Sequence, residues 1–112
     1  MKIKVSELTG AALDWAVAKA WQPVYSDGAL LAAVLQDGYH PSTEWTQGGP
    51  IIERHIFRLE DGDGVEDWPD RWLAEGSGST QYGQTALIAA MRAYVESKLG
   101  EWVEIEIPDE LL

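Results

Sequence analysis

A segment rich in glycine and proline, residues 36–50, carries several side chains that could bind a ligand: Tyr39, Ser42, Thr43 and Trp45. Two aromatic faces and two hydroxyls among such residues suit a pocket for a planar, polar ligand. The same composition also suits a loop that folds its own rings inward as a satellite core. The sequence leaves both interpretations open.

A second aromatic candidate is Trp15, in a stretch with helical periodicity. At about 100° per residue, it lies about 200° from Leu13 on the helix surface. We therefore expect Trp15 to face away from the core stripe, where its ring could be a stacking platform for a base or a nicotinamide-like group. The alternative is that a loop packs over the ring. The expected core stripe consists of Leu13, Ala16, Val17 and Ala20.

The best predicted anion site is the start of a helix at Thr85. The free N–H groups and the dipole of a helix N-terminus favour a phosphate or a carboxylate. Arg92 lies seven residues further on, on the same face and about 10.5 Å along the axis. Because helical side chains lean towards the N-terminus, Arg92 could reach part of the way back. Alternatively, it pairs with Glu96 one turn later.

Catalytic and metal-binding patterns are weak in this chain. His40, Glu53 and His55 could in principle hold a metal, but their spacing matches no known type of site. The run Asp61–Gly64 resembles a calcium loop but lacks the following oxygen ligand and the glycine of that motif. We therefore expect neither an enzyme nor a cofactor.

Composition limits the partners and the compartment. Nineteen acidic residues against eight basic ones give a net charge of −11, which disfavours direct nucleic-acid binding. The acidity indicates either a solvated surface or a face that docks on a basic patch of another protein. Without cysteine, a signal-peptide pattern or a long apolar run, the chain is expected to be cytoplasmic, with no membrane contact.

The elements that must position these residues indicate an α+β fold: a small sheet with two main helices packed on it, in a single compact domain over residues 1–112. Two helices are expected, one after Ser6 or Thr9 and one after Thr85. The run 29–35 fits either a helix or a strand, and the turn signals that bracket it favour a strand. The first expected helix starts after Ser6 or Thr9 and runs to about residue 21, and the second covers about residues 86–99. The expected strands are 2–5, 29–35, a segment through Ile56 and Leu59, 72–74 and 102–107. The expected loops are 36–50, an acidic loop over 60–75 and a Gly/Ser linker before the last helix.

Four blocks of the sequence resemble the NinX family of lambdoid phages: residues 1–18, 41–53, 85–95 and 108–111. The segment from Trp72 into the last helix is also similar to a wider group of phage proteins with an α/β/α-sandwich domain. The resemblance implies a phage or prophage origin and expression inside an infected bacterium. The family belongs to a nonessential accessory block of phage genes, and it implies no established biochemical activity.

Two functions follow as expectations. The first is a non-enzymatic accessory protein that binds a small nucleotide-like ligand and so sequesters a host immune signal. In this first function, Trp15 and Trp45 stack on the ligand, and Ser42 and Thr43 hydrogen-bond to it. An anionic group of the ligand lies near Thr85 and Arg92. The second is an acidic, DNA-mimic-like module that binds and inhibits a host protein through residues 60–70 together with the C-terminal acidic residues. A homo-oligomer is a further possibility.

Overall fold

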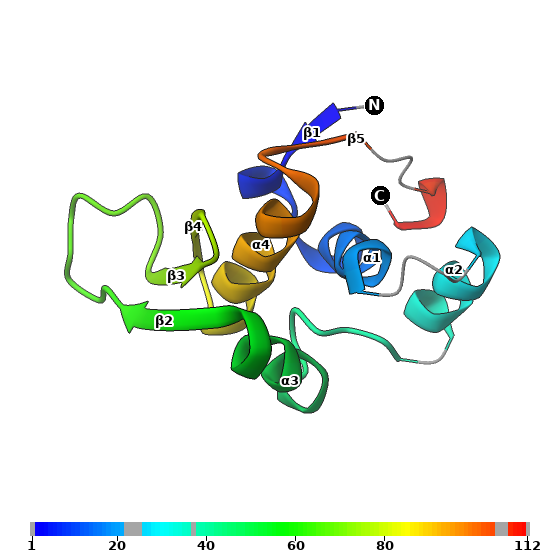
Figure 1. Cartoon of the computed structure of the whole chain (residues 1–112), viewed down its shortest axis with the longest axis horizontal. Helices are drawn as coiled ribbons and strands as arrows, with labels where there is room; N and C mark the ends of the chain where they lie inside the picture. The colour runs from blue at the N-terminus through cyan, green and yellow to red at the C-terminus, as the bar shows by residue number, and fades with distance from the viewer. Residues whose placement is uncertain (1, 22–25, 37, 105–107, 112) are drawn as a thin grey trace.

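Helix α4, residues Ala86–Leu99, forms the centre of the fold (Figure 1). The structure, a computed structural model, describes residues 2–21, 26–36, 38–104 and 108–111. The predicted helix ends are confirmed. The Thr85 hydroxyl accepts a hydrogen bond from the amide of Ile88 at 3.1 Å, and Gly100 follows the helix with a φ of +90°, a conformation that favours glycine.

A three-stranded antiparallel sheet packs against one side of α4, as Figure 1 shows. Its order is β2 (Ile56–Asp61), β3 (Trp72–Gly76) and β4 (Ser79–Gly83). The strands expected through Ile56 and Leu59 and over residues 72–74 are therefore confirmed. The α+β class expected from the sequence is confirmed as well.

Strand β4 was not expected, because the glycine- and serine-rich segment before α4 was interpreted as a linker. That interpretation is wrong. Gly76 pairs with Ser79, so residues 77 and 78 form a tight two-residue turn, and Gly78 has a φ of +74°. The Ser79 hydroxyl donates a hydrogen bond of 2.7 Å to the carbonyl of Ala93, which fixes the hairpin to α4.

A second, two-stranded sheet joins segments from near the two ends of the chain. Strand β1 (Lys2–Lys4) pairs antiparallel with β5 (Trp102–Glu104), and Val5 begins a short 3-10 turn over Val5–Glu7. Both strands were expected. The rest of the second predicted strand, residues 105–107, lies outside the described residues.

Helix α1 (Gly10–Trp21) packs on the side of α4 opposite the sheet, and α2 (Asp27–Leu35) packs on α1 (Figure 1). The strand expected over residues 29–35 is wrong. The Ser26 hydroxyl accepts a hydrogen bond from the amide of Ala29 at 3.2 Å and caps the helix. Leu30 and Val34, four residues apart, then face the core.

Helix α3 (Trp45–His55) occupies much of the segment expected to be a loop, so that expectation is wrong too. Pro50 lies inside this helix, and Gly48 and Gly49 precede it, which is why local propensity favoured a loop. Packing overrides that propensity, because Gly48 and Ile51 are buried on one face of the helix. Residues 36–44 remain as the connection between α2 and α3.

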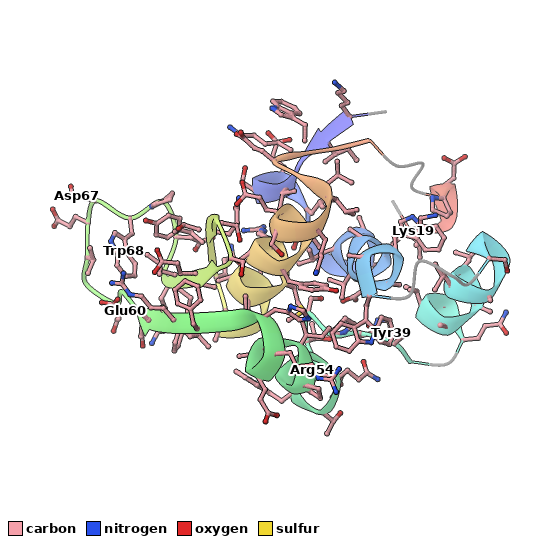
Figure 2. All side chains as sticks on the ribbon, viewed as in Figure 1. Lys19, Tyr39, Arg54, Glu60, Asp67 and Trp68 are labelled. Atoms are coloured by element: carbon pink, nitrogen blue, oxygen red, sulfur yellow. The ribbon has the colours of Figure 1, made fainter. Side chains whose placement is uncertain are left out.

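The acidic segment forms the β2–β3 connection, which projects from the sheet. Figure 2 shows Asp67 at the outer bend of this connection and Trp68 further along it. The Trp68 ring lies 5.6 Å from the ring of Tyr82 on β4. Within the described residues, no helix is both long and apolar enough to cross a bilayer.

Candidate functional site

A cavity of about 590 Å³ lies where the start of α3 approaches the start of α4. Four of the residues singled out in the sequence line it: Ser42, Thr43, Trp45 and Thr85. They come from two segments about forty residues apart in the chain. The volume falls within the usual range for small-molecule sites, roughly 300–1,000 Å³.

Gly48 allows α3 to approach α4 closely enough to form this cavity. A Cβ atom at Gly48 would lie 2.5 Å from the carbonyl oxygen of Pro41 and 2.6 Å from Cδ2 of Leu87. Both distances are shorter than a real carbon contact. The missing side chain therefore allows the contact between the two helices beside the cavity.

Ser42 is held in the cavity wall by its backbone. Its amide donates a hydrogen bond of 2.9 Å to Oδ1 of Asp14, a buried carboxylate on α1. The other carboxylate oxygen of Asp14 lies 3.2 Å from Nδ1 of His40. Asp14 thus ties the connection before α3 to the core helix at two points.

The Ser42 hydroxyl itself has no hydrogen-bond partner among the described residues, although the residue is only 1% exposed. A buried hydroxyl without a partner costs about 1–3 kcal/mol. Such atoms are rare in folded proteins and often belong to a site that a ligand or a water molecule completes. Ser42 lines the cavity, and its hydroxyl is the buried polar atom of this wall that has no partner among the described residues.

Two features of the cavity favour a negatively charged ligand. The first turn of α4 lines it, and the N–H groups of Ala86 and Leu87 have no carbonyl of their own helix to bind. Arg71 lies on the wall as well. Its Nε and Nη2 atoms each donate a 2.9 Å hydrogen bond to Asp61, which leaves the Nη1 hydrogens for another acceptor.

Two tryptophans supply aromatic surface to the same cavity. Trp45, the first residue of α3, is 56% exposed, and Trp72, the first residue of β3, is partly exposed. The guanidinium of Arg71 lies 5.9 Å from the Trp72 ring centre, close enough for a cation–π contact. Sequence reasoning missed both Arg71 and Trp72, because only strand pairing brings them opposite α4.

Trp15 does not line this cavity, and the expectation that it faces away from the core is wrong. Its ring is 1% exposed. Helix α1 is buried at six successive positions, Leu13 to Ala18, because α4 and α2 both pack against it. A helix buried on several sides has no single core stripe, so the angular argument fails. Lys19 lies 5.8 Å from the Trp15 ring centre.

Arg92 and Tyr39 also lie outside the cavity. The Arg92 guanidinium donates to the carbonyls of Leu8 and Tyr82, each at 2.8 Å, rather than reaching towards Thr85. Burial lowers its pKa from the ordinary value, and Asp70 opposes that change. Tyr39 packs at the edge of the core, where burial, followed by Tyr94 and Asp14, raises its pKa to about 12.

The two histidines lie in different places. His40 pairs with Asp14, whereas His55 packs against Tyr94 with ring centres 4.8 Å apart. In the described part of the chain, no three histidine, cysteine, aspartate or glutamate side chains gather as a metal site would require. The set of His40, Glu53 and His55 considered from the sequence is therefore not brought together.

The family comparison covers the sequence blocks 41–53 and 85–95 and most of 1–18, whereas 108–111 lies outside the match. A family model described as "Bacteriophage P22, NinX" matches residues 4–98, most of the chain and all the residues that line the cavity. The chain therefore belongs to this family. No curated protein matches the chain.

Proposed function

We propose that this member of the P22 NinX family is a non-enzymatic phage accessory protein that binds a small nucleotide-like ligand in the cavity between α3 and α4. By holding the ligand, it would sequester a host immune signal. The main observation behind the proposal is that one cavity of suitable size is lined by Ser42, Thr43, Trp45 and Thr85.

The chemistry of the walls divides between the two halves of such a ligand. Trp45 and Trp72 offer aromatic faces, on which a base would stack. The first turn of α4 and the Nη1 hydrogens of Arg71 offer N–H donors, which suit a phosphate, although Asp61 already balances the charge of Arg71. The hydroxyls of Ser42 and Thr43 would hydrogen-bond to the polar edge of the ring system. Arg71 and Trp72 replace Arg92 and Trp15 in the roles expected from the sequence.

A thermal-shift screen tests the proposal directly. The panel consists of cyclic mononucleotides, cyclic oligonucleotides and signalling molecules derived from NAD. A ligand at about 100 times its dissociation constant adds roughly 2.7 kcal/mol of stability. For a domain of this size that corresponds to a rise in the melting temperature of several degrees. A panel without any shift counts against the proposal.

Two tryptophan variants then locate the binding site. Trp45→Ala should abolish the shift, because it removes an aromatic wall of the cavity. Trp102→Ala is the matched control, since Trp102 is 54% exposed but lies on β5, outside the cavity wall. Loss of the shift in both variants, or in neither, contradicts this location.

The acidic alternative would show itself in a different experiment. Asp63, Glu66 and Asp67 are exposed on the β2–β3 connection and would form the face that docks on a basic patch. Capture of one host protein would then weaken steeply with salt. Reversing the charges of these three residues should abolish it. This outcome, together with a silent ligand screen, would favour the interaction module over the ligand binder.

A further inference from the structure

A second cavity, of about 460 Å³, lies at the opposite ends of the same two helices. Helix α3 starts at the first cavity with Trp45 and ends at the second with Arg54 and His55. Helix α4 likewise leads from the first cavity to Lys98, in its last turn. Figure 2 shows Arg54 on α3. The lining residues of the second cavity are Ala20, Trp21, Arg54, His55, Tyr94 and Lys98.

The lining of this cavity contains two cations and no carboxylate. Neither Arg54 nor Lys98 forms an ion pair with any residue that the structure describes. By contrast, Arg58 and Arg71 are both paired with acids. The chain has only eight lysines and arginines against nineteen acids, so two cations without an acidic partner at one cavity stand out.

Three aromatic rings, those of Trp21, His55 and Tyr94, line the cavity together with these cations. The Trp21 ring centre lies 5.8 Å from His55 and 5.9 Å from Tyr94. The Arg54 guanidinium lies 5.8 Å from the Trp21 ring centre, within reach of a cation–π contact. Burial, followed by the charges of Lys98 and Arg54, lowers the pKa of His55. The charges of Arg54 and Lys98 therefore both act at His55.

Helix dipoles explain part of this arrangement but not all of it. Basic residues are favoured in the last turn of a helix, whose C-terminus carries about half a negative charge. Arg54 and Lys98 both occupy such positions, on α3 and α4. Two cations against two helix ends still leave about one net positive charge at the cavity. The helix dipoles explain why each helix ends with a basic residue. They do not explain why both basic residues line the same cavity.

We propose that this second cavity binds a small divalent oxyanion, the phosphate group of a phosphorylated small molecule, between Arg54 and Lys98. The guanidinium offers a planar fork of donors, the ammonium offers a point charge, and the neutral imidazole of His55 offers one further N–H. Arg54 and Lys98 are both exposed, so an anion from solvent can reach both cations. None of these residues lines the first cavity, so the two proposals stand or fall separately.

The test is a titration of the ¹⁵N-labelled protein with inorganic phosphate and, separately, with phenyl phosphate, at constant ionic strength and neutral pH. We expect saturable shifts of the Trp21 indole N–H, the Arg54 side-chain N–H and the Lys98 amide. Tighter binding of phenyl phosphate would indicate a phosphorylated organic ligand, and equal binding would indicate the free ion. Shifts that remain linear, or that are absent, would overturn the proposal.

Three glutamine variants complete the experiment. Arg54→Gln and Lys98→Gln should each weaken phosphate binding at Trp21 by tenfold or more. Arg58→Gln is the control, because it removes the same charge from an exposed arginine on β2 outside both cavities. Equal weakening in all three variants would show an effect of net charge alone and overturn the site. Unchanged phosphate binding in Arg54→Gln and Lys98→Gln would also overturn the site.

The amides of Ala86 and Leu87 report separately on phosphate at the first cavity, where a helix N-terminus also attracts anions. Trp45→Ala should leave the shifts at Trp21 unchanged. If shifts occur only at Ala86 and Leu87, the second cavity does not bind phosphate, and the proposal for it is wrong.

Discussion

Ser42 presents a hydroxyl that folding buries without giving it a partner among the described residues. Removing it should not weaken the fold. Ser42→Ala should leave the free energy of unfolding of the unliganded protein unchanged or raise it by up to about 1 kcal/mol, because the cost of burying the hydroxyl disappears. The same change should weaken binding of the ligand found in the thermal-shift screen.

Urea denaturation and calorimetric titration measure these two effects independently. Thr43→Val is the comparison variant for stability, because the Thr43 hydroxyl is exposed and already has a contact, 3.4 Å from the carbonyl of His40. Its ligand binding should weaken as well, since the same hydroxyl is a proposed ligand contact. A loss of more than about 1 kcal/mol in Ser42→Ala would mean that the hydroxyl has a structural role.

His55 gives a pH-dependent prediction. Its pKa is lowered in the folded protein, first by burial and then by Lys98 and Arg54, so the unfolded chain binds a proton more readily. The resulting stability is present above the unfolded pKa of about 6.5 and is lost as the pH falls through the folded pKa. Histidine ring signals in an NMR titration give the folded pKa directly.

His55→Phe should remove this part of the pH dependence while keeping a ring against Tyr94. Urea denaturation of both proteins between about pH 7.5 and pH 5 makes the comparison. If the wild type and the variant lose stability in parallel over that range, His55 does not contribute to it.

At the scale of single residues, some of the residues that line the first cavity were predicted from the sequence as ligand contacts and others were not. Ser42, Thr43, Trp45 and Thr85 were recognised because their types and their neighbours already indicate ligand chemistry. Arg71 could not be recognised, since its place on the wall depends on strand pairing between distant segments. Trp15 and Arg92 were misplaced because helix geometry gives a direction but not what packs there.

At the scale of elements, Gly48 should be the most sensitive position in α3. Gly48→Ala puts a methyl group 2.5 Å from the carbonyl oxygen of Pro41, so the helix or the connection must shift. Overpacking of this kind costs about 1–3 kcal/mol. The variant should be less stable in urea denaturation, and it should also bind the ligand of the first cavity less tightly.

Gly49→Ala provides a matched control one residue along the same helix. A Cβ at Gly49 meets nothing within 4 Å, and its φ is not in the left-handed region. Alanine is favoured over glycine in a helix interior by about 0.5–1 kcal/mol. Gly49 also precedes Pro50, whose ring crowds a Cβ at the preceding helical position and offsets this gain. This variant should therefore stay within about 1 kcal/mol of the wild type. Equal losses in both variants would show that α3 simply tolerates no substitution there.

The elements differ in how well the sequence predicted them, for physical reasons. Helix α4 has a cap, a period of apolar residues and a terminal glycine that all agree, so its bounds were predicted correctly. Helix α3 contains Pro50 and two glycines and exists because tertiary contacts outweigh local propensity. Strand β4 is short and polar, and pairing with β3 rather than its own pattern defines it.

At the scale of the whole molecule, Arg92 joins parts that are far apart in the chain. Its guanidinium connects the carbonyl of Leu8, before α1, to the carbonyl of Tyr82, on β4. Arg92→Leu leaves both half-buried carbonyls without this donor. A hydrogen bond to a charged group contributes about 1.5–3 kcal/mol. At the lower value for each of the two bonds, the variant should lose about 3 kcal/mol of unfolding free energy in urea denaturation.

Arg58→Leu is the control for Arg92→Leu, because Arg58 is exposed and forms ion pairs with Glu60 and Glu75 on the sheet surface. It should change stability by less than about 1 kcal/mol. A comparable loss in both variants would assign the effect to net charge rather than to the link between Leu8 and Tyr82.

The net charge of −11 has its own consequence for the molecule as a whole. The described fold spans 41 × 29 × 22 Å, so carboxylates on opposite faces lie several Debye lengths apart at physiological salt, where that length is about 8 Å. At low salt the length grows to about 30 Å and like charges repel across the whole molecule. The free energy of unfolding should therefore rise as sodium chloride increases from about 0.01 M to about 0.15 M.

Repeating the urea denaturation series with potassium chloride separates screening from specific ion binding, because screening depends on ionic strength alone. Equal gains with both salts are expected. A variant with Asp63, Glu66 and Asp67 replaced by asparagine or glutamine should gain less, since part of the repulsion is already gone. If stability is flat with salt, the basic residues already balance their acidic neighbours locally, and the acidic surface places no strain on the fold.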